Sequence, residues 1–222
     1  MEIPLDVINI IASYIVKHPM KLLDWLDIND INWGHISENP NAIDLLEANP
    51  DKINWSYLSC NPNAIHLLEA NQDKINWGWL STNPNAIHIL EANQHNINWK
   101  SLSSNPNAIK LLEANLDKIY WYWLSKNPNG IKLLEASPDK IVWFLLSENP
   151  NAIHLLEANL DKINWEHLTT NPNAIHILKA NKTKICYNYN FIYNNHNIFE
   201  PDTKSINENI LNNAIILDKI IN

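Results

Sequence analysis

The sequence has little glycine and little cysteine. Only 3 of the 222 residues are glycine. Glycine-rich phosphate loops and dinucleotide-binding turns need several glycines at fixed offsets, so the sequence excludes both. The two cysteines, Cys60 and Cys186, are too few for a disulfide framework or a cysteine zinc site. The low cysteine content therefore favours a reducing, intracellular setting.

Arginine is absent, and all 16 basic residues are lysine, against 24 acidic residues and a net charge of −8. Binding to nucleic acids is driven by basic side chains that neutralise phosphates, and arginine is their best phosphate and guanine partner. The composition therefore predicts that nucleic acid is not a partner. Repeat-based RNA binding remains an alternative, because some helical repeats stack and read one base per unit.

Long apolar runs are also missing. No stretch of 18 consecutive apolar residues occurs, so we expect neither a transmembrane helix nor a membrane partner. The opening residues, Met1 to Pro4, lack the basic region of a secretory signal. Hydrophobic residues still make up 45% of the chain, which is enough to build a folded core. These features predict a folded intracellular protein.

Tryptophan and asparagine, in contrast, are abundant and recur at one fixed period of 22 residues. The repeated tryptophans are Trp33, Trp55, Trp77, Trp99, Trp121, Trp143 and Trp165. The triplet Asn-Pro-Asn starts at Asn39, Asn61, Asn83, Asn105, Asn127, Asn149 and Asn171. A fixed period of this length is typical of solenoids, propellers or arrays.

Each repeat contains the pattern of a helix that follows the Asn-Pro-Asn triplet. In residues 61–71, Asn61 is a suitable N-cap and Pro62 fits the first helical position. The apolar residues between them and the end of the segment follow helical spacing. Asn71 suits a residue with positive φ that ends the helix. We therefore expect a helix of about nine residues here.

A shorter helix precedes the triplet. Asn54 is a plausible N-cap, Trp55 occupies the first helical position, and the helix must end near Cys60. The capping asparagine is replaced by Tyr120 and Val142 in two repeats. Alternation with a period of two is absent, which argues against a β-solenoid or a propeller. The predicted fold is all-α, an α-solenoid of seven to eight helix-turn-helix repeats closed by capping helices at both ends.

The repeats divide the chain into three parts. Residues 1–19 form an N-terminal capping segment, in which Pro4 to Lys17 has the pattern of one amphipathic helix. Residues 20–186 form the repeat array. In residues 187–222 the pattern dissolves, and we expect an irregular segment followed by a closing helix from Thr203 to Ile221.

The repeat motif Trp-X-X-Leu-Ser-X-Asn-Pro-Asn-Ala-Ile-X-Leu-Leu-Glu-Ala-Asn-X-Asp-Lys-Ile resembles a tandem-repeat family of mimivirus-type giant viruses of amoebae. The resemblance covers residues 20–186. The sequence departs from it at Gly130, at Ser137-Pro138, at His95-Asn96 and at Lys179. The resemblance implies a viral protein that acts in the host cytoplasm, and it implies no biochemical activity.

The N-terminal segment carries a second resemblance. Residues Ile3 to Ile15, Ile-Pro-Leu-Asp-Val-Ile-Asn-Ile-Ile-Ala-Ser-Tyr-Ile, are similar to the opening helix of an F-box. F-box proteins join a ubiquitin-ligase scaffold to a substrate-binding repeat domain. This resemblance implies an alternative function as an F-box-like substrate receptor that recruits targets to a host ubiquitin ligase. The other interpretation of the segment is a simple capping helix.

Function is most readily sought at positions that vary between repeats. The two positions after each repeated tryptophan differ from unit to unit and carry extra large apolar residues. We call the following six residues the variable aromatic set: Tyr57, Trp79, Tyr122, Trp123, Phe144 and Leu145. They are predicted to point away from the seam filled by the repeated tryptophans, as an exposed ridge that binds a protein. Packing as a second core layer is the alternative.

Other functional classes lack support in the sequence. Histidine recurs on the second helix at His66, His88, His154 and His176. Adjacent repeats bring together only two of these histidines, which are too few ligands for zinc, so we predict no metal site. Pairing of these histidines with the glutamate three residues later, such as Glu69, is the expected arrangement. No nucleophile or zinc-protease motif occurs, and we predict a protein without catalytic residues or cofactor. The predicted function is a non-enzymatic protein-binding module.

Overall fold

The computed structural model describes residues 21–185 together with Asn195 and Asn197. Residues 21–185 contain helices, turns and loops and no β-strand, which confirms the all-α repeat fold. The predicted capping helix at Pro4 to Lys17, its F-box-like interpretation and the closing helix at Thr203 to Ile221 lie outside the described residues. The chain forms two compact units, Met1–Leu124 and Ser125–Asn222.

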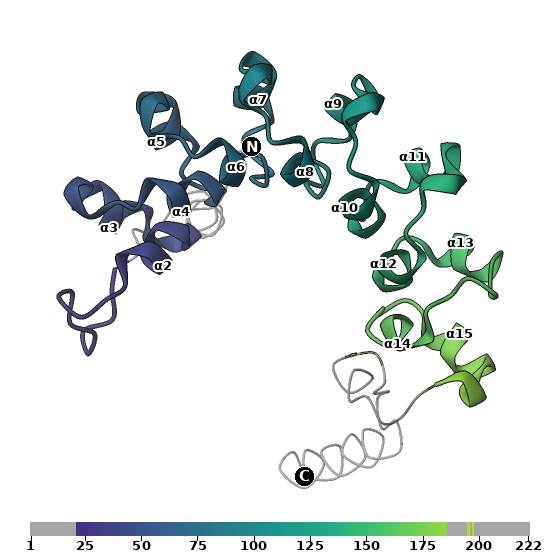
Figure 1. The fold of residues 1–222 in the computed structure, drawn as a ribbon. Coiled ribbons are helices and arrows are strands. Elements are labelled where there is room, and N and C mark those ends of the chain that lie inside the picture. The colour runs from purple at the N-terminus through teal and green to yellow at the C-terminus, as the bar shows by residue number, and fades with distance from the viewer. Residues whose placement is uncertain (1–20, 186–194, 196, 198–222) are drawn as a thin grey trace, which may run out of the picture. The chain divides into compact units, whose positions relative to one another are not determined.

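Every repeat contributes two short helices (Figure 1). The first helices are α2 (Trp33–Glu38), α4 (Trp55–Cys60), α6 (Trp77–Leu80), α8 (Trp99–Leu102), α10 (Trp121–Lys126), α12 (Trp143–Glu148) and α14 (Trp165–Leu168). The second helices are α3 (Ile43–Glu47), α5 (Ile65–Ala70), α7 (Ile87–Ala92), α9 (Ile109–Glu113), α11 (Ile131–Ala136), α13 (Ile153–Glu157) and α15 (Ile175–Ala180). Within Met1–Leu124, helices α2, α4, α6 and α8 form one row, and helices α3, α5, α7 and α9 form a second row.

Short 3₁₀ turns complete the repeats. They are η1 (Pro40–Ala42), η2 (Pro50–Lys52), η3 (Gln72–Lys74), η4 (Gln94–Asn96), η5 (Leu116–Lys118), η6 (Pro138–Lys140) and η7 (Lys182–Lys184). All except η1 directly follow a second helix, where the sequence analysis expected only a chain reversal. Each repeat with such a turn therefore has three helical elements instead of two.

The start of the first helix agrees with its prediction. The Oδ1 atom of Asn54 accepts a hydrogen bond from the backbone N–H of Tyr57, as an N-cap should. The replacement Val142 makes no side-chain capping bond to α12. The predicted end of α4 at Cys60 is also confirmed.

The second helix is shorter than predicted at its N-terminus. Asn61 and Pro62 lie in a turn, and α5 begins only at Ile65. The prediction of positive φ at Asn71 is wrong, since its φ is −137° and no residue of the described chain has positive φ. Instead, the Asn71 side-chain amide donates to the carbonyl of Leu67 at 2.9 Å and occupies an acceptor at the helix end.

The core consists of leucines contributed by both rows of helices. In the repeats that begin at α4 through α12, two leucines per repeat, such as Leu58 from α4 and Leu68 from α5, have no exposed surface. Burial of one such side chain contributes about 1.5–3 kcal/mol, and none of these helices reaches the ~12 residues needed for stability in isolation. Packing between repeats, such as α2 on α4, α4 on α6 and α12 on α14, therefore holds the helices in place.

A line of buried asparagines joins consecutive repeats, and we call it the asparagine ladder. Asn61 is fully buried, and its Nδ2 donates to the carbonyls of Ser37 and Asn39 at 2.9 and 3.0 Å. Its Oδ1 accepts from the N–H of Asn63 at 3.0 Å. The same pair of donations to the preceding repeat recurs at Asn83, Asn105, Asn149 and Asn171.

A buried serine lies beside the ladder in the repeats that begin at α2 through α12, and Thr169 takes its place in the last described repeat. The Ser59 hydroxyl donates to the carbonyl of Trp55 at 2.7 Å and accepts from the N–H of Asn76 in the next repeat at 3.0 Å. One hydroxyl therefore satisfies two backbone groups from adjacent repeats. The position of the next short helix is thereby fixed by hydrogen bonds as well as by leucine packing.

The ladder extends beyond the predicted end of the array at residue 186. The side-chain amide of Asn195 donates to the carbonyls of Thr169 and Asn171 at 3.1 and 2.8 Å. Asn197 donates to the carbonyl of Pro172 at 2.7 Å, as Asn173 does to Pro150. These two residues lie in the segment where the repeat pattern was expected to dissolve, and they add one further step to the ladder.

Candidate binding surface

The variable aromatic set divides into three classes of exposure. Trp79 and Tyr122 are each 46% exposed, as predicted for a ridge. Tyr57, Trp123 and Phe144 are half-buried. These five rings are therefore accessible in part or in large measure. The role of these rings in binding stays a prediction.

The prediction of an exposed side chain is wrong for Leu145, because only 6% of its surface is exposed. The prediction placed side chains by their angle around a single short helix. Helix α12 packs directly on α14, so part of that angle is covered by the neighbouring repeat. A leucine is short enough to stay within this contact, whereas a ring reaches past it. Leu145 is a core residue and leaves the variable aromatic set as a binding candidate.

Three rings from consecutive repeats lie in a continuous row, which we call the ring stack. The His35 and Tyr57 rings are tilted, with centroids 6.1 Å apart and an interplanar angle of 55°, whereas the Tyr57 and Trp79 rings are stacked, with centroids 6.1 Å apart and an angle of 26°. The three residues come from α2, α4 and α6, one per repeat. Stacked rings at this spacing support one another in fixed orientations.

Small residues lie next to each ring of the stack. Position one after the repeated tryptophan holds Gly34, Ser56 and Gly78 in these repeats. A Cβ atom at Gly34 would approach the Tyr57 ring to 3.4 Å. Because Gly34 has no side chain, the face of the Tyr57 ring next to it is not covered.

The repeated tryptophans do not fill the seam as predicted. Each is half-buried, and in four repeats the ammonium group of a lysine from the end of the same repeat lies over the indole ring. The Nζ–centroid distances are 4.6 Å for Lys74 and Trp55, 4.5 Å for Lys118 and Trp99, 4.9 Å for Lys162 and Trp143, and 4.8 Å for Lys184 and Trp165. The rings are therefore held by cation–π contacts at the edge of the core. Asn96 occupies the equivalent lysine position for Trp77.

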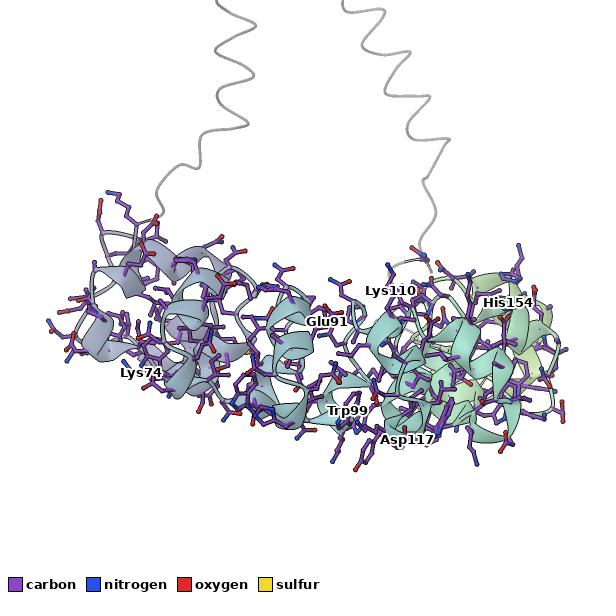
Figure 2. All side chains as sticks on the ribbon, turned by 90° about the horizontal axis from the view of Figure 1, so that it is seen from above. Lys74, Glu91, Trp99, Lys110, Asp117 and His154 are labelled. Carbon is purple, nitrogen blue, oxygen red and sulfur yellow. The ribbon has the colours of Figure 1, made fainter. Side chains whose placement is uncertain are left out.

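An open groove of about 540 Å³ lies between the start of α8 and the η5 turn, and we call it the Trp99 groove. Its lining includes Asn98, Trp99, Lys100, Asp117, Lys118 and Tyr120. Figure 2 shows Trp99 and Asp117 beside one another at one edge of the unit, while Lys110 lies toward the opposite edge. Tyr120 is 52% exposed and stands where other repeats have the capping asparagine.

A second groove, of about 450 Å³, lies at the first described residues. Its lining includes four apolar residues, among them Trp25, which is 78% exposed, and four polar ones, among them His35 of the ring stack. The ring stack therefore continues into an apolar surface.

Histidine–glutamate pairs form between repeats and not within one helix, which corrects the prediction. His66 Nε2 lies 2.7 Å from Glu47 Oε1 of the preceding repeat, and His88 lies 2.8 Å from Glu69. His154 with Glu135 and His176 with Glu157 repeat the arrangement in the second unit. Side chains of these pairs are about half exposed, so each contributes little to stability.

In the second unit, His167, which lies two positions after the repeated Trp165, contacts an aromatic ring as well as a glutamate. The His167 ring lies 5.3 Å from the ring of Phe144, and its Nδ1 pairs with Glu148. Glu148 is also 3.4 Å from the Lys126 ammonium. Glu148 thus holds His167 against the aromatic residue of the preceding repeat.

Reactive or metal-binding groups are few among the described residues. Cys60 is a free thiol that donates to the carbonyl of Tyr57 at 3.1 Å, and burial, helped by the Glu38 charge, raises its pKa. Within the described part of the chain, no three His, Cys, Asp or Glu side chains gather in a way that could hold a metal ion. No helix in that part combines the length and apolar character needed to cross a bilayer.

No family model, curated protein or solved structure matches the chain.

Proposed function

We propose that the chain is a non-enzymatic helical-repeat module that binds another protein through the exposed rings of its short helices. The observation that carries the proposal is the ring stack of His35, Tyr57 and Trp79, which ends in a tryptophan with 46% of its surface exposed. Tryptophan and tyrosine are the residues most enriched at the energetic centres of protein interfaces.

The geometry of the ring stack also suits binding. Each ring is supported by its neighbour at 6.1 Å, so little side-chain freedom remains to be lost when a partner binds. Tyr122 adds an exposed ring, packed edge-to-face on Trp123 at 5.3 Å. Exposed rings held in fixed orientations form a preorganised surface, and such a surface binds a partner more tightly than a flexible one.

The rigid part of the repeat is separate from these rings. Leucines, serines and ladder asparagines hold the repeats together in the interior, while residues after the repeated tryptophan vary at the surface. This division is typical of repeat proteins that bind partners. In keeping with the sequence resemblance, we propose that the partner is a host or viral protein in the cytoplasm of an amoeba infected by a giant virus.

The experiment is affinity capture from amoeba lysate with the tagged full chain, followed by mass spectrometry. Two single variants with similar exposure are compared, Trp79→Ala at 46% and Leu160→Ala at 40%. The proposal predicts that a protein retained by the wild type and by Leu160→Ala is lost with Trp79→Ala. Equal retention by both variants would refute the role of the ring stack.

A further inference from the structure

The Trp99 groove differs chemically from the equivalent place in other repeats. Its lining includes Tyr120 in place of the capping asparagine, so a phenol ring joins the indole of Trp99 in the groove wall. Tyr120 is 52% exposed and the nearby Leu116 is 56% exposed. The groove therefore offers aromatic and aliphatic surface to a ligand.

Two lysines flank this apolar surface. The Lys118 Nζ lies 4.5 Å above the Trp99 ring and 3.2 Å from Asn115 Oδ1, while the Lys100 Nζ lies 5.9 Å from the Trp123 ring. Among the described residues, neither lysine lies within 4 Å of a carboxylate oxygen. Both ammonium groups thus keep their capacity to pair with an anion.

Some other lysines of the chain are paired with carboxylates, whereas Lys74, Lys162 and Lys184 lie over tryptophan rings as Lys118 does. Lys52 pairs with Asp51 at 3.4 Å, Lys140 with Asp139 at 3.1 Å, and Lys126 with Glu148 at 3.4 Å. In the Trp99 groove, Asp117 is the single acidic residue of the lining, against Lys100 and Lys118. In a chain of net charge −8, the groove is a local site of positive charge with aromatic walls.

We infer that the Trp99 groove binds an acidic peptide segment of the partner, with one apolar side chain placed against Trp99 and Tyr120 and carboxylates paired with Lys100 and Lys118. This inference rests on the proposed function and adds the chemistry of the partner. The groove of about 540 Å³ accepts one or two side chains, and the opposite charges give the segment its orientation.

The same features favour a peptide over RNA. A bound RNA strand places a phosphate at every nucleotide, and its affinity grows with the number of phosphates that basic residues neutralise. Only two lysines line the groove, the acidic Asp117 lines it with them, and the chain has no arginine. Two carboxylates on either side of an apolar side chain match this arrangement better than a polyphosphate does.

The test uses a phage-displayed library of random dodecapeptides selected on the immobilised full chain. Selected peptides are then synthesised with fluorescein, and their binding is measured by fluorescence anisotropy. We expect the enriched sequences to share carboxylates on either side of an aromatic or aliphatic residue. The double variant Lys100→Glu with Lys118→Glu should weaken their binding at least about tenfold.

The matched control is Lys52→Glu with Lys110→Glu, which changes the net charge equally on the same unit but outside the groove. It should change the affinity less than about twofold, and circular dichroism should show both double variants folded. The inference would be overturned if the library enriched neutral or basic peptides, or no peptides at all. It would also be overturned if both double variants lost affinity equally, or if a uridine oligonucleotide bound more tightly at the same site. A peptide that binds as predicted supports this inference even if the capture experiment in lysate fails. If capture in lysate depends on Trp79 but no acidic peptide binds, this inference is rejected and the proposed function is retained.

Discussion

The side-chain amide of Asn83 donates a hydrogen bond to the backbone carbonyl of Asn61, 22 residues earlier, at 2.9 Å. A second donation reaches the carbonyl of Ser59 at 3.1 Å, and the Asn83 Oδ1 accepts from the N–H of Asn85. One buried side chain thus satisfies three backbone groups. Since the bonds are identical from repeat to repeat, they set the distance between neighbouring short helices.

Asn83→Ala should therefore lower the free energy of unfolding by about 2–4 kcal/mol, because it removes three hydrogen bonds made by one fully buried side chain. Asn85→Ala is the matched control, since Asn85 is exposed and loses only its bond to the carbonyl of Pro62. Its cost should be below about 1 kcal/mol. Urea denaturation followed by circular dichroism measures both, and equal costs would contradict the ladder's structural role.

Asn96→Lys should stabilise the protein. Asn96 stands where other repeats place the lysine that covers the repeated tryptophan, so the substitution supplies an ammonium group for Trp77. A gain of about 0.5–1 kcal/mol is expected in the free energy of unfolding. Asn96→Met, which adds the aliphatic chain without the charge, should give a smaller gain. A methionine variant as stable as the lysine variant would show that the charge contributes nothing.

Leu145→Ala and Trp79→Ala compare equivalent positions of two repeats, one buried and one exposed. Leu145 is 6% exposed, so its truncation leaves a cavity and should cost about 2–4 kcal/mol. Trp79 is 46% exposed, and its loss should cost about 1–2 kcal/mol despite the larger side chain. Thermal unfolding of the two variants gives the order. Complete unfolding of Trp79→Ala would assign this ring to the core.

Cys60 should react slowly with thiol reagents. Burial raises its pKa, so at pH 8 a smaller fraction is thiolate than in a free cysteine, and the thiolate is the nucleophile. In a Cys186→Ser variant, we expect the reaction with Ellman's reagent to be about an order of magnitude slower than that of glutathione. Addition of urea to unfolding concentrations should remove the difference. A native rate equal to that of glutathione would contradict the burial of this thiol.

The sequence predicted the fold because the period of 22 residues and the helical spacing within it are both local patterns. The caps of the first helices were predicted for the same reason, as Asn54 shows. The ladder was not predicted, because its bonds join residues 22 and 24 apart. Asn61 was assigned to local capping, although a polar residue repeated at one position between buried leucines could have indicated an internal role.

The candidate surface was predicted in part. The exposure of Trp79 and Tyr122 follows from their positions on the short helices, whereas the burial of Leu145 depends on contact between two helices. The inter-repeat pairing of His66 with Glu47 is likewise a matter of how repeats stack. The Trp99 groove was missed because it arises from a loop and a 3₁₀ turn, although Tyr120 in a capping position was a visible signal.

Photo-crosslinking from the position of Trp79 tests the central claim most directly. The full chain carrying p-benzoyl-L-phenylalanine in place of Trp79 is irradiated in amoeba lysate, with the same residue in place of Leu160 as control. The account predicts one protein adduct, identified by mass spectrometry, from position 79 and none from position 160. The same adducts from both positions, or none from position 79, would contradict binding through the ring stack.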